Sequence, residues 1–115
     1  MRLTSRSFNN DKRIPAEFAF CAPDPKSHST LSKNLNPHLQ WQDVPMNAKS
    51  LALICHDPDV PSKPDDVNKE GRTISAQLPR VDFFHWLLVD LPAATLQIRP
   101  GEFSGGVKPR GKPGP

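Results

Sequence analysis

Apolar and polar residues alternate with a period of two in several short segments of the chain. Residues 2–8 and 16–20 each place alternate side chains on one face, which predicts two short strands. Residues 51–55 and 83–89 are apolar at nearly every position, a pattern typical of strands that are buried on both faces. The alternation at residues 96–98 predicts one more short strand.

Polar stretches separate these predicted strands. Residues 21–37 are rich in Ser, Asn, Pro and Lys, which predicts a loop. Residues 62–82 are interpreted as an insertion loop, and the part from Ser62 to Leu78 should be irregular and exposed because its charged side chains resist burial. The Gly/Pro-rich residues 101–115 predict a basic tail or loop rather than a grip on nucleic acid, because no aromatic residues are interleaved with the cations.

Proline is the outlier of the composition, and it limits the fold class. It makes up 14 of the 115 residues, more than twice its usual share of about 5%. Because proline lacks an N–H donor and breaks helices, its spread along the chain excludes a helical bundle and a doubly wound α/β fold. The length suits one domain with one modest core. We therefore predict a single, mainly β domain over residues 1–115.

Charge and composition exclude several classes of function. The formal net charge of +3 is too mild to predict nucleic-acid binding. No apolar run approaches the ~18 residues of a membrane span, and the amino-terminal residues lack the apolar core of a signal peptide. We therefore expect a cytoplasmic protein without stable membrane insertion, in which Cys21 and Cys55 are small apolar residues and form no disulfide. No metal site is predicted, because no regular spacing relates His28, His38 and His56.

The sequence LALICHDPDVP, residues 51–61, leads from an apolar strand directly into two aspartates. A phosphotransferase of the haloacid-dehalogenase type presents an aspartate nucleophile in this way, but it requires a helix after the motif. Three prolines forbid that helix, at Pro58, Pro61 and Pro64. A calcium loop is excluded as well, because the residues at positions 5, 6 and 12 of such a loop do not match. Pro58–Lys63 fits the P-x-x-P-x-K pattern of docking peptides, but prolines that stiffen a loop are the simpler interpretation.

His85 shares one face of its predicted strand with Phe83 and Leu87. A histidine in such a place is commonly a hydrogen-bonded core residue. A functional role is also open if the two apolar strands are neighbours, because Asp57 or Asp59 would then lie beside the imidazole. A carboxylate in that position fixes the tautomer of the ring and favours its charged form. Such a pair, walled by Phe83 and prolines, suits an anion or a headgroup, and we expect the side chains of Asp57 and His85 within about 10 Å of each other.

Several short motifs follow one another in a specific order and spacing. They are Asn36–Trp41 (NPHLQW), Ser50–Ile54 (SLALI), Asp57–Pro61 (DPDVP), His85-Trp86 and Val89–Pro92 (VDLP). On these motifs the chain resembles the phosphatidylethanolamine-binding protein family, also called Raf kinase inhibitor protein-like. It is similar to the bacterial branch that carries a long insertion after Asp-Pro-Asp-x-Pro.

The resemblance implies a fold and a pocket. The fold is a central antiparallel sheet packed on a smaller one, incomplete at the C-terminus. The pocket binds a small anion at one end of the sheet, and its ligand-binding positions match Asp57, Val60, Pro61, Phe83 and His85. We expect no catalytic residue, no metal and no cofactor.

The resemblance also implies supporting roles around the pocket. Asp59 is expected to brace the loop by accepting backbone N–H bonds. Trp41 and Trp86 are assigned to packing. The peptide bond between Val60 and Pro61 is expected to be cis, because a pocket loop that reverses after a buried strand gains from this tight geometry.

One family motif has no counterpart in this chain. Family members carry Gly-x-His-Arg followed by an aromatic residue, which supplies another pocket histidine, whereas no histidine follows His85 here. The chain is therefore expected to correspond to the N-terminal two-thirds of a family member.

The leading hypothesis is a non-enzymatic binding protein for a phosphorylated or anionic small ligand, such as phosphate, a phospholipid headgroup or a nucleotide. The resemblance also implies modulation of a protein partner, a kinase or a protease, and the fold does not choose among these roles. An alternative is a phosphoester hydrolase that uses the Asp57/His85 pair for acid–base chemistry. A third hypothesis is an inactive fragment that lacks the second ligand-binding motif.

Overall fold

The structure is a computed structural model that describes residues 1–67 and 69–104. These residues are mainly β, which confirms the fold class expected from the sequence. Their elements are β1 (Arg2–Thr4), the 3₁₀-helix η1 (Ala16–Phe18), β2 (Cys21–Asp24), β3 (His28–Leu31), β4 (Leu39–Gln42), β5 (Ser50–Pro61), β6 (Arg80–Pro92) and β7 (Gln97–Ile98). Within the described ranges, no helix has the length and apolar character needed to cross a membrane.

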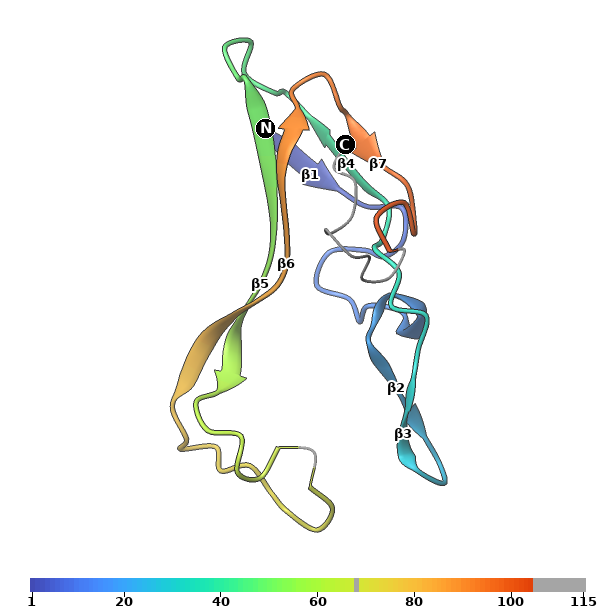
Figure 1. The fold of residues 1–115 in the computed structure, drawn as a ribbon, viewed down its shortest axis with the longest axis vertical. Coiled ribbons are helices and arrows are strands. Elements are labelled where there is room, and N and C mark those ends of the chain that lie inside the picture. Colours follow the sequence, from blue (N-terminus) through green and yellow to red (C-terminus); the bar gives the residue numbers. More distant parts are fainter. Residues whose placement is uncertain (68, 105–115) are drawn as a thin grey trace, which may run out of the picture. The chain divides into compact units, whose positions relative to one another are not determined.

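The chain divides into two compact units. Unit 1 comprises residues 1–50 and 91–115, and unit 2 comprises residues 51–90. Unit 1 holds a three-stranded sheet in the order β1-β4-β7 and the separate pair β2-β3, whereas β5 pairs with β6 (Figure 1). The basic tail predicted for residues 101–115 lies outside the described residues from position 105 onward.

The hydrophobic core of unit 1 is small. β4 is the central strand of the sheet and pairs antiparallel with β1, where Leu3 is the partner of Trp41, and with β7. The buried hydrophobic side chains among the described residues are those of Trp41, Leu91 and Ile98. The Trp41 indole N–H also donates a hydrogen bond to the carbonyl oxygen of Thr95 (2.6 Å). The packing role of Trp41 and the last predicted strand are thus confirmed.

β1 is shorter than the alternation at residues 2–8 predicts. The residues after β1 do not continue the strand. The hydroxyl groups of Ser5 and Ser7 instead form hydrogen bonds with the backbone of the buried His38. The Ser5 hydroxyl donates to the carbonyl oxygen of His38 (2.6 Å), and the His38 N–H donates to Oγ of Ser7 (2.9 Å). The Arg6 backbone N–H donates to Nδ1 of His38 (3.1 Å), and the Arg6 side chain contacts Nε2 on the other side of the ring. His38 is therefore a hydrogen-bonded core histidine.

The strand predicted at residues 16–20 is wrong, because the structure has the 3₁₀-helix η1 there. Pro15 precedes the helix, and its carbonyl oxygen accepts the N–H of Phe18 (3.0 Å). The carbonyl oxygen of Ala16 accepts the N–H of Ala19 in the same way (3.0 Å). These local bonds satisfy backbone groups that a strand would have to pair with a neighbour.

The loop predicted for residues 21–37 is also wrong in part, because β2 and β3 form an antiparallel hairpin within it. One oxygen of the Asp24 carboxylate fixes the turn by accepting the backbone N–H groups of Lys26 (2.9 Å) and Ser27 (2.7 Å). The bond from the Ser27 N–H is the largest of the causes that lower the pKa of Asp24. Turn-forming residues of this kind dominate the composition of the segment, so its sequence does not predict the two short strands beside them.

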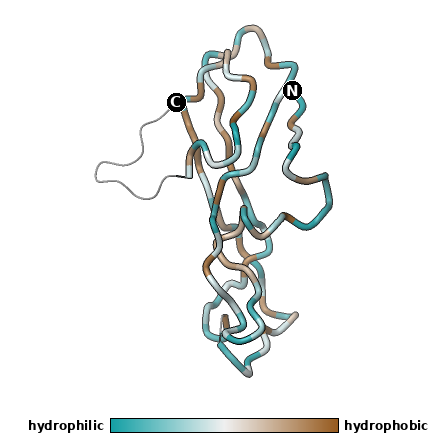
Figure 2. Tube along the Cα trace, turned by 90° about the vertical axis from the view of Figure 1, so that its right-hand side faces the viewer, coloured by the Kyte–Doolittle hydropathy of each residue, from teal (hydrophilic) through white to brown (hydrophobic). Residues whose placement is uncertain are grey.

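Unit 2 is built on the long strands β5 and β6, which run in opposite directions (Figure 1). Both extend beyond the apolar segments, so the DPDVP motif belongs to β5 rather than to the loop after it. The expected burial of both strand faces is wrong: the Ile54 side chain is 57% exposed and that of Phe83 is 50% exposed. The reason is that the described residues of unit 2 hold no other strand or helix to cover these faces. Hydrophobic and hydrophilic segments alternate along the chain instead of forming one long apolar stretch (Figure 2).

The connection between β5 and β6 is irregular and mostly exposed in its described residues, as predicted. The expected cis bond between Val60 and Pro61 is wrong, since the described residues contain no cis peptide bond. β5 continues through Pro61, and the Ser62 N–H donates to the carbonyl oxygen of Pro79 (3.0 Å). The chain therefore stays extended at this proline and does not reverse, and the trans form is favoured by about 0.5–1 kcal/mol.

A buried asparagine joins the segment before β4 to the turn after β7. Oδ1 of Asn36 accepts the Phe103 backbone N–H (2.8 Å) and the Ser104 hydroxyl (3.0 Å). Its Nδ2 donates to the carbonyl oxygens of Arg99 (2.8 Å) and Pro37 (3.1 Å). Both ends of the carboxamide are thus engaged in a place with little access to water, where a lost partner is costly.

We expect Asn36→Ala to lower the free energy of unfolding by about 2–3 kcal/mol, because it leaves buried backbone groups of unit 1 without partners. The measurement is urea unfolding followed by circular dichroism. Asn47→Ala is the matched control, since Asn47 is exposed in the turn between β4 and β5, and it should change the free energy by no more than about 0.5 kcal/mol. Equal losses in the two variants would contradict the role assigned to Asn36.

Candidate functional site

Asp57 of β5 and His85 of β6 lie side by side on the hairpin. His85 Nε2 is 3.5 Å from Asp57 Oδ2, which confirms the predicted proximity. The two side chains are 51% and 41% exposed, so this histidine is accessible to solvent and is no core residue. A carboxylate at this distance orients the imidazole ring. Because Nε2 faces Asp57, Nδ1 is the ring nitrogen that remains available to a ligand.

Asp57 is held by the backbone of its own strand. Its second oxygen, Oδ1, accepts the backbone N–H of Asp59 at 2.8 Å. The bracing role expected of Asp59 is therefore wrong in its direction, because Asp59 donates this bond and Asp57 accepts it. The reason is local: an aspartate side chain readily reaches the N–H two residues further along the chain. The motif thus fixes the carboxylate that contacts His85.

The Asp59 carboxylate pairs with a cation that the sequence reasoning missed. Its Oδ1 lies 3.5 Å from Nε of Arg80, the first residue of β6. The Asp59 side chain is 82% exposed and that of Arg80 is 31% exposed, so the pair is open to water mainly on the side of the carboxylate. The signal in the sequence was a single arginine ahead of an apolar strand, which identifies no partner.

Phe83 borders the histidine. Its ring meets the ring of His85 nearly edge-on, with centroids 4.9 Å apart and planes at 66°. Both residues come from β6 and share one face, because side chains two positions apart in a strand point the same way. Val60 and Pro61 are half-buried at the end of β5. That Phe83, Val60 and Pro61 contact a ligand stays a prediction.

A second histidine–aspartate pair lies on the opposite face of the hairpin. His56 Nε2 is 2.9 Å from Asp82 Oδ1, and the His56 ring stacks on that of Phe84 with centroids 5.1 Å apart. Because His56 and Asp57 are neighbours in one strand, their side chains point to opposite faces. Sequence reasoning missed this pair because it compared His56 only with His28 and His38 and placed Asp82 in the insertion loop.

Hydrogen bonding and burial shift two pKa values near this site. The bond from the Asp59 N–H is the main reason why the pKa of Asp57 lies below its ordinary value, and contacts with His85 lower it further against the opposing effect of desolvation. Burial, followed by the charge of Asp57, raises the pKa of the Cys55 thiol. Cys21 and Cys55 are both free. The site thus presents an ionised Asp57 next to a protonated thiol.

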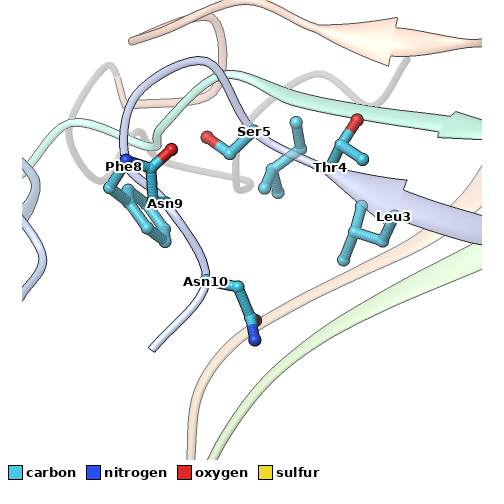
Figure 3. A pocket seen from close by; sticks show the side chains of 7 residues that line it. Leu3, Thr4, Ser5, Phe8, Asn9 and Asn10 are labelled. Atoms are coloured by element: carbon cyan, nitrogen blue, oxygen red, sulfur yellow. The ribbon is translucent and has the colours of Figure 1, made fainter. Parts of the chain in front are cut away.

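A cavity of about 380 Å³ lies in unit 1, and none of the residues proposed to bind a ligand lines it. Figure 3 shows it beside β1, with Leu3 and Thr4 on one side and Phe8 and Asn9 on the other. Across residues 1–67 and 69–104, no group of three His, Cys, Asp or Glu side chains could hold a metal ion.

The chain is thus a small, mainly β protein whose long hairpin carries an ordered aspartate–histidine pair beside an aromatic ring. Residues 4–113 match the family described as "Phosphatidylethanolamine-binding protein". Because this match spans nearly the whole sequence, the chain belongs to the phosphatidylethanolamine-binding protein family.

Individual relatives agree with this assignment. The chain is 31% identical to a UPF0098 protein of Aquifex aeolicus, over 85% of this chain and 41% of the relative. It is 28% identical to the UPF0098 protein YbhB of Escherichia coli, over 93% of this chain and 53% of the relative. The crystal structure of a phosphatidylethanolamine-binding protein homologue from Chlamydia trachomatis matches with a TM-score of 0.57 and 29% identity, over 86% of this chain and 50% of that one. The chain spans about half the length of the relatives it matches.

The local origin of the Asp57 shift can be tested by titrating its carboxyl carbon by nuclear magnetic resonance. We expect a pKa below the ordinary aspartate value of about 3.9. In His85→Gln the pKa should rise but stay below that value, because the Asp59 N–H is the larger cause and is still present. His56→Gln is the control and should have a smaller effect, since its charge is the last of the causes. A complete return to the ordinary value in His85→Gln would contradict the dominance of the backbone bond.

The lowered pKa also predicts how stability depends on pH. The folded chain favours the ionised carboxylate, so this contribution is fully present above the pKa that Asp57 has in the unfolded chain. It is lost as the pH falls through the lower pKa of the folded state. In Asp57→Asn the unfolding midpoint should therefore fall less steeply than in the parent as the pH is lowered from 5. A profile equal to that of the parent would contradict this assignment.

Proposed function

We propose that the chain is a non-enzymatic binding protein for a phosphorylated or anionic small ligand, with Asp57 and His85 at the centre of its site. The observation that carries the proposal is the 3.5 Å contact between His85 Nε2 and Asp57 Oδ2 on two exposed strands. Membership of the phosphatidylethanolamine-binding protein family supports the same assignment. The cytoplasm is the location we expect for this activity.

His85 is the residue that would contact the anion. In a ring that carries protons on both nitrogens, Nε2–H donates to Asp57 and Nδ1–H donates to a phosphate oxygen as a charge-assisted hydrogen bond. The ring of Phe83 supplies an apolar border next to the imidazole. Val60 and Pro61, further along β5, are the remaining residues proposed to contact the ligand. Inorganic phosphate, a phospholipid headgroup and a nucleotide all offer the phosphate oxygens that this arrangement suits.

The state of Asp57 argues against this carboxylate as the general base of a hydrolase. A general base works best when its pKa lies near the working pH, whereas the pKa of Asp57 is lowered and both of its oxygens are engaged. A carboxylate in this state orients His85 but is a weak proton acceptor. Modulation of a kinase or a protease would be a further consequence of ligand binding, and this part of the proposal rests on the family resemblance.

Inorganic phosphate and O-phosphoethanolamine are the probes for this proposal. Each should shift the backbone amide resonances around His85 in a saturable way with one ligand per chain. His85→Ala should weaken the binding of both about tenfold, because a charge-assisted hydrogen bond worth roughly 1.5 kcal/mol is lost. Tighter binding of O-phosphoethanolamine than of phosphate would favour a headgroup as the source of the ligand.

His56→Ala is the matched control for this experiment. It removes a histidine with the same kind of aspartate partner from the opposite face of the hairpin and should leave phosphate binding unchanged. p-Nitrophenyl phosphate should not be turned over, and turnover that disappears in His85→Ala would favour the hydrolase hypothesis instead. If the parent chain shows no saturable uptake of either probe, the binding proposal is rejected.

A further inference from the structure

We infer that Arg80 anchors the bound phosphate group and that the ligand takes the place of the Asp59 carboxylate on the Arg80 guanidinium. This inference rests on the binding function proposed above and adds a specificity-determining residue to its site. It assigns the ligand as a phosphate ester or inorganic phosphate with oxygens for two anchoring points, the His85 ring and the Arg80 guanidinium.

A continuous series of contacts joins Arg80 to His85. Arg80 Nε lies 3.5 Å from Asp59 Oδ1, and the Asp59 backbone N–H donates to Asp57 Oδ1 at 2.8 Å. Asp57 Oδ2 in turn lies 3.5 Å from His85 Nε2. All four residues come from the paired strands β5 and β6, and the four side chains linked by these successive contacts are called the cluster below.

The charges of this cluster do not suit an anion while Arg80 is paired with Asp59. The cluster holds one permanently positive group, Arg80, and two carboxylates, Asp57 and Asp59. With His85 neutral the four side chains therefore carry a net charge of −1, and with His85 protonated they carry zero. An anion gains the guanidinium as a direct partner only if the carboxylate now paired with it moves away, whereas Asp57 is fixed by its bond from the backbone. Asp59 is the carboxylate that can be exchanged, because its side chain is 82% exposed.

The Arg80–Asp59 contact is of a kind that a ligand can replace. It joins one guanidinium nitrogen, Nε, to one carboxylate oxygen, and exposed ion pairs of this type contribute little to stability. A phosphate can instead accept two parallel hydrogen bonds from the planar guanidinium, which is the stronger arrangement. The Arg80 side chain is 31% exposed, so it is held in place better than a fully solvated arginine while its partner is free to move away.

The test measures the dissociation constant of inorganic phosphate by amide resonance shifts of the full chain at constant ionic strength. Arg80→Gln should weaken binding at least about tenfold, as expected when a charged hydrogen-bond donor is lost. Asp59→Asn should tighten binding about two- to fivefold, because it releases the guanidinium without the need for exchange. In the double variant the gain from Asp59→Asn should vanish, since the gain acts through Arg80.

Arg72 and Asp66 provide a matched control pair. Arg72 Nε lies 3.9 Å from Asp66 Oδ1 in the connection between β5 and β6, so the same atoms meet in the same unit. Arg72→Gln and Asp66→Asn change the net charge by the same amounts and should leave phosphate binding within about twofold of the parent. Circular dichroism spectra and thermal midpoints equal to those of the parent show that each variant is folded before its binding is compared.

The outcomes separate this inference from the proposal on which it rests. If the parent takes up no phosphate, or if His85→Ala binds as the parent does, the proposed function itself fails. If binding depends on His85 but Arg80→Gln binds as tightly as the parent, only the anchoring role of Arg80 is overturned. The anchoring role of Arg80 is also overturned if Asp59→Asn weakens phosphate binding. It is overturned as well if Asp59→Asn still tightens binding in the Arg80→Gln background, because the effect would then come from a change of structure or of overall charge.

Discussion

The carboxylate of Asp57 makes one local and one long-range contact, and the candidate site depends on both. Its Oδ1 is fixed by an N–H two residues further along the same strand, which requires no other part of the fold to be in place. Its Oδ2 meets His85, which lies 28 residues away in the sequence on the neighbouring strand. A short motif therefore sets the orientation of a carboxylate, and that carboxylate then orients the imidazole.

Unit 1 is held by polar groups as much as by apolar ones. Besides Trp41, Leu91 and Ile98, its buried residues include His38 and Asn36, and both have hydrogen-bond partners from distant parts of the chain. A small apolar core gives little preference for one arrangement over another. Directional bonds to a buried imidazole and a buried carboxamide supply that preference, because an alternative arrangement would leave these groups without partners.

The sequence predicts the mainly β class, the irregular insertion and the meeting of Asp57 with His85, because these follow from proline content, charge and two apolar segments. It fails where a local bond decides between alternatives. At residues 16–20 the period-two pattern competes with the i to i+3 bonds that begin at Pro15, and the bonds prevail. At Val60–Pro61 a cis bond was expected from a reversal that does not occur. The pairs His56–Asp82 and Arg80–Asp59 were not predicted because they depend on the register between β5 and β6. Neither composition nor periodicity determines that register.

The strands that position the site are 12 and 13 residues long, and among the described residues of unit 2 they pair only with each other. A two-stranded ribbon has two open edges, along which backbone N–H and C=O groups point away from the existing pair. Half-exposed apolar side chains such as Ile54 and Phe83 lie along the same strands. Any extended segment that added to such an edge would gain backbone hydrogen bonds and cover apolar surface in one step. Strand addition of this kind would couple the stability of the hairpin to the concentration of whatever supplies the added strand, so the rigidity of the site would follow mass action.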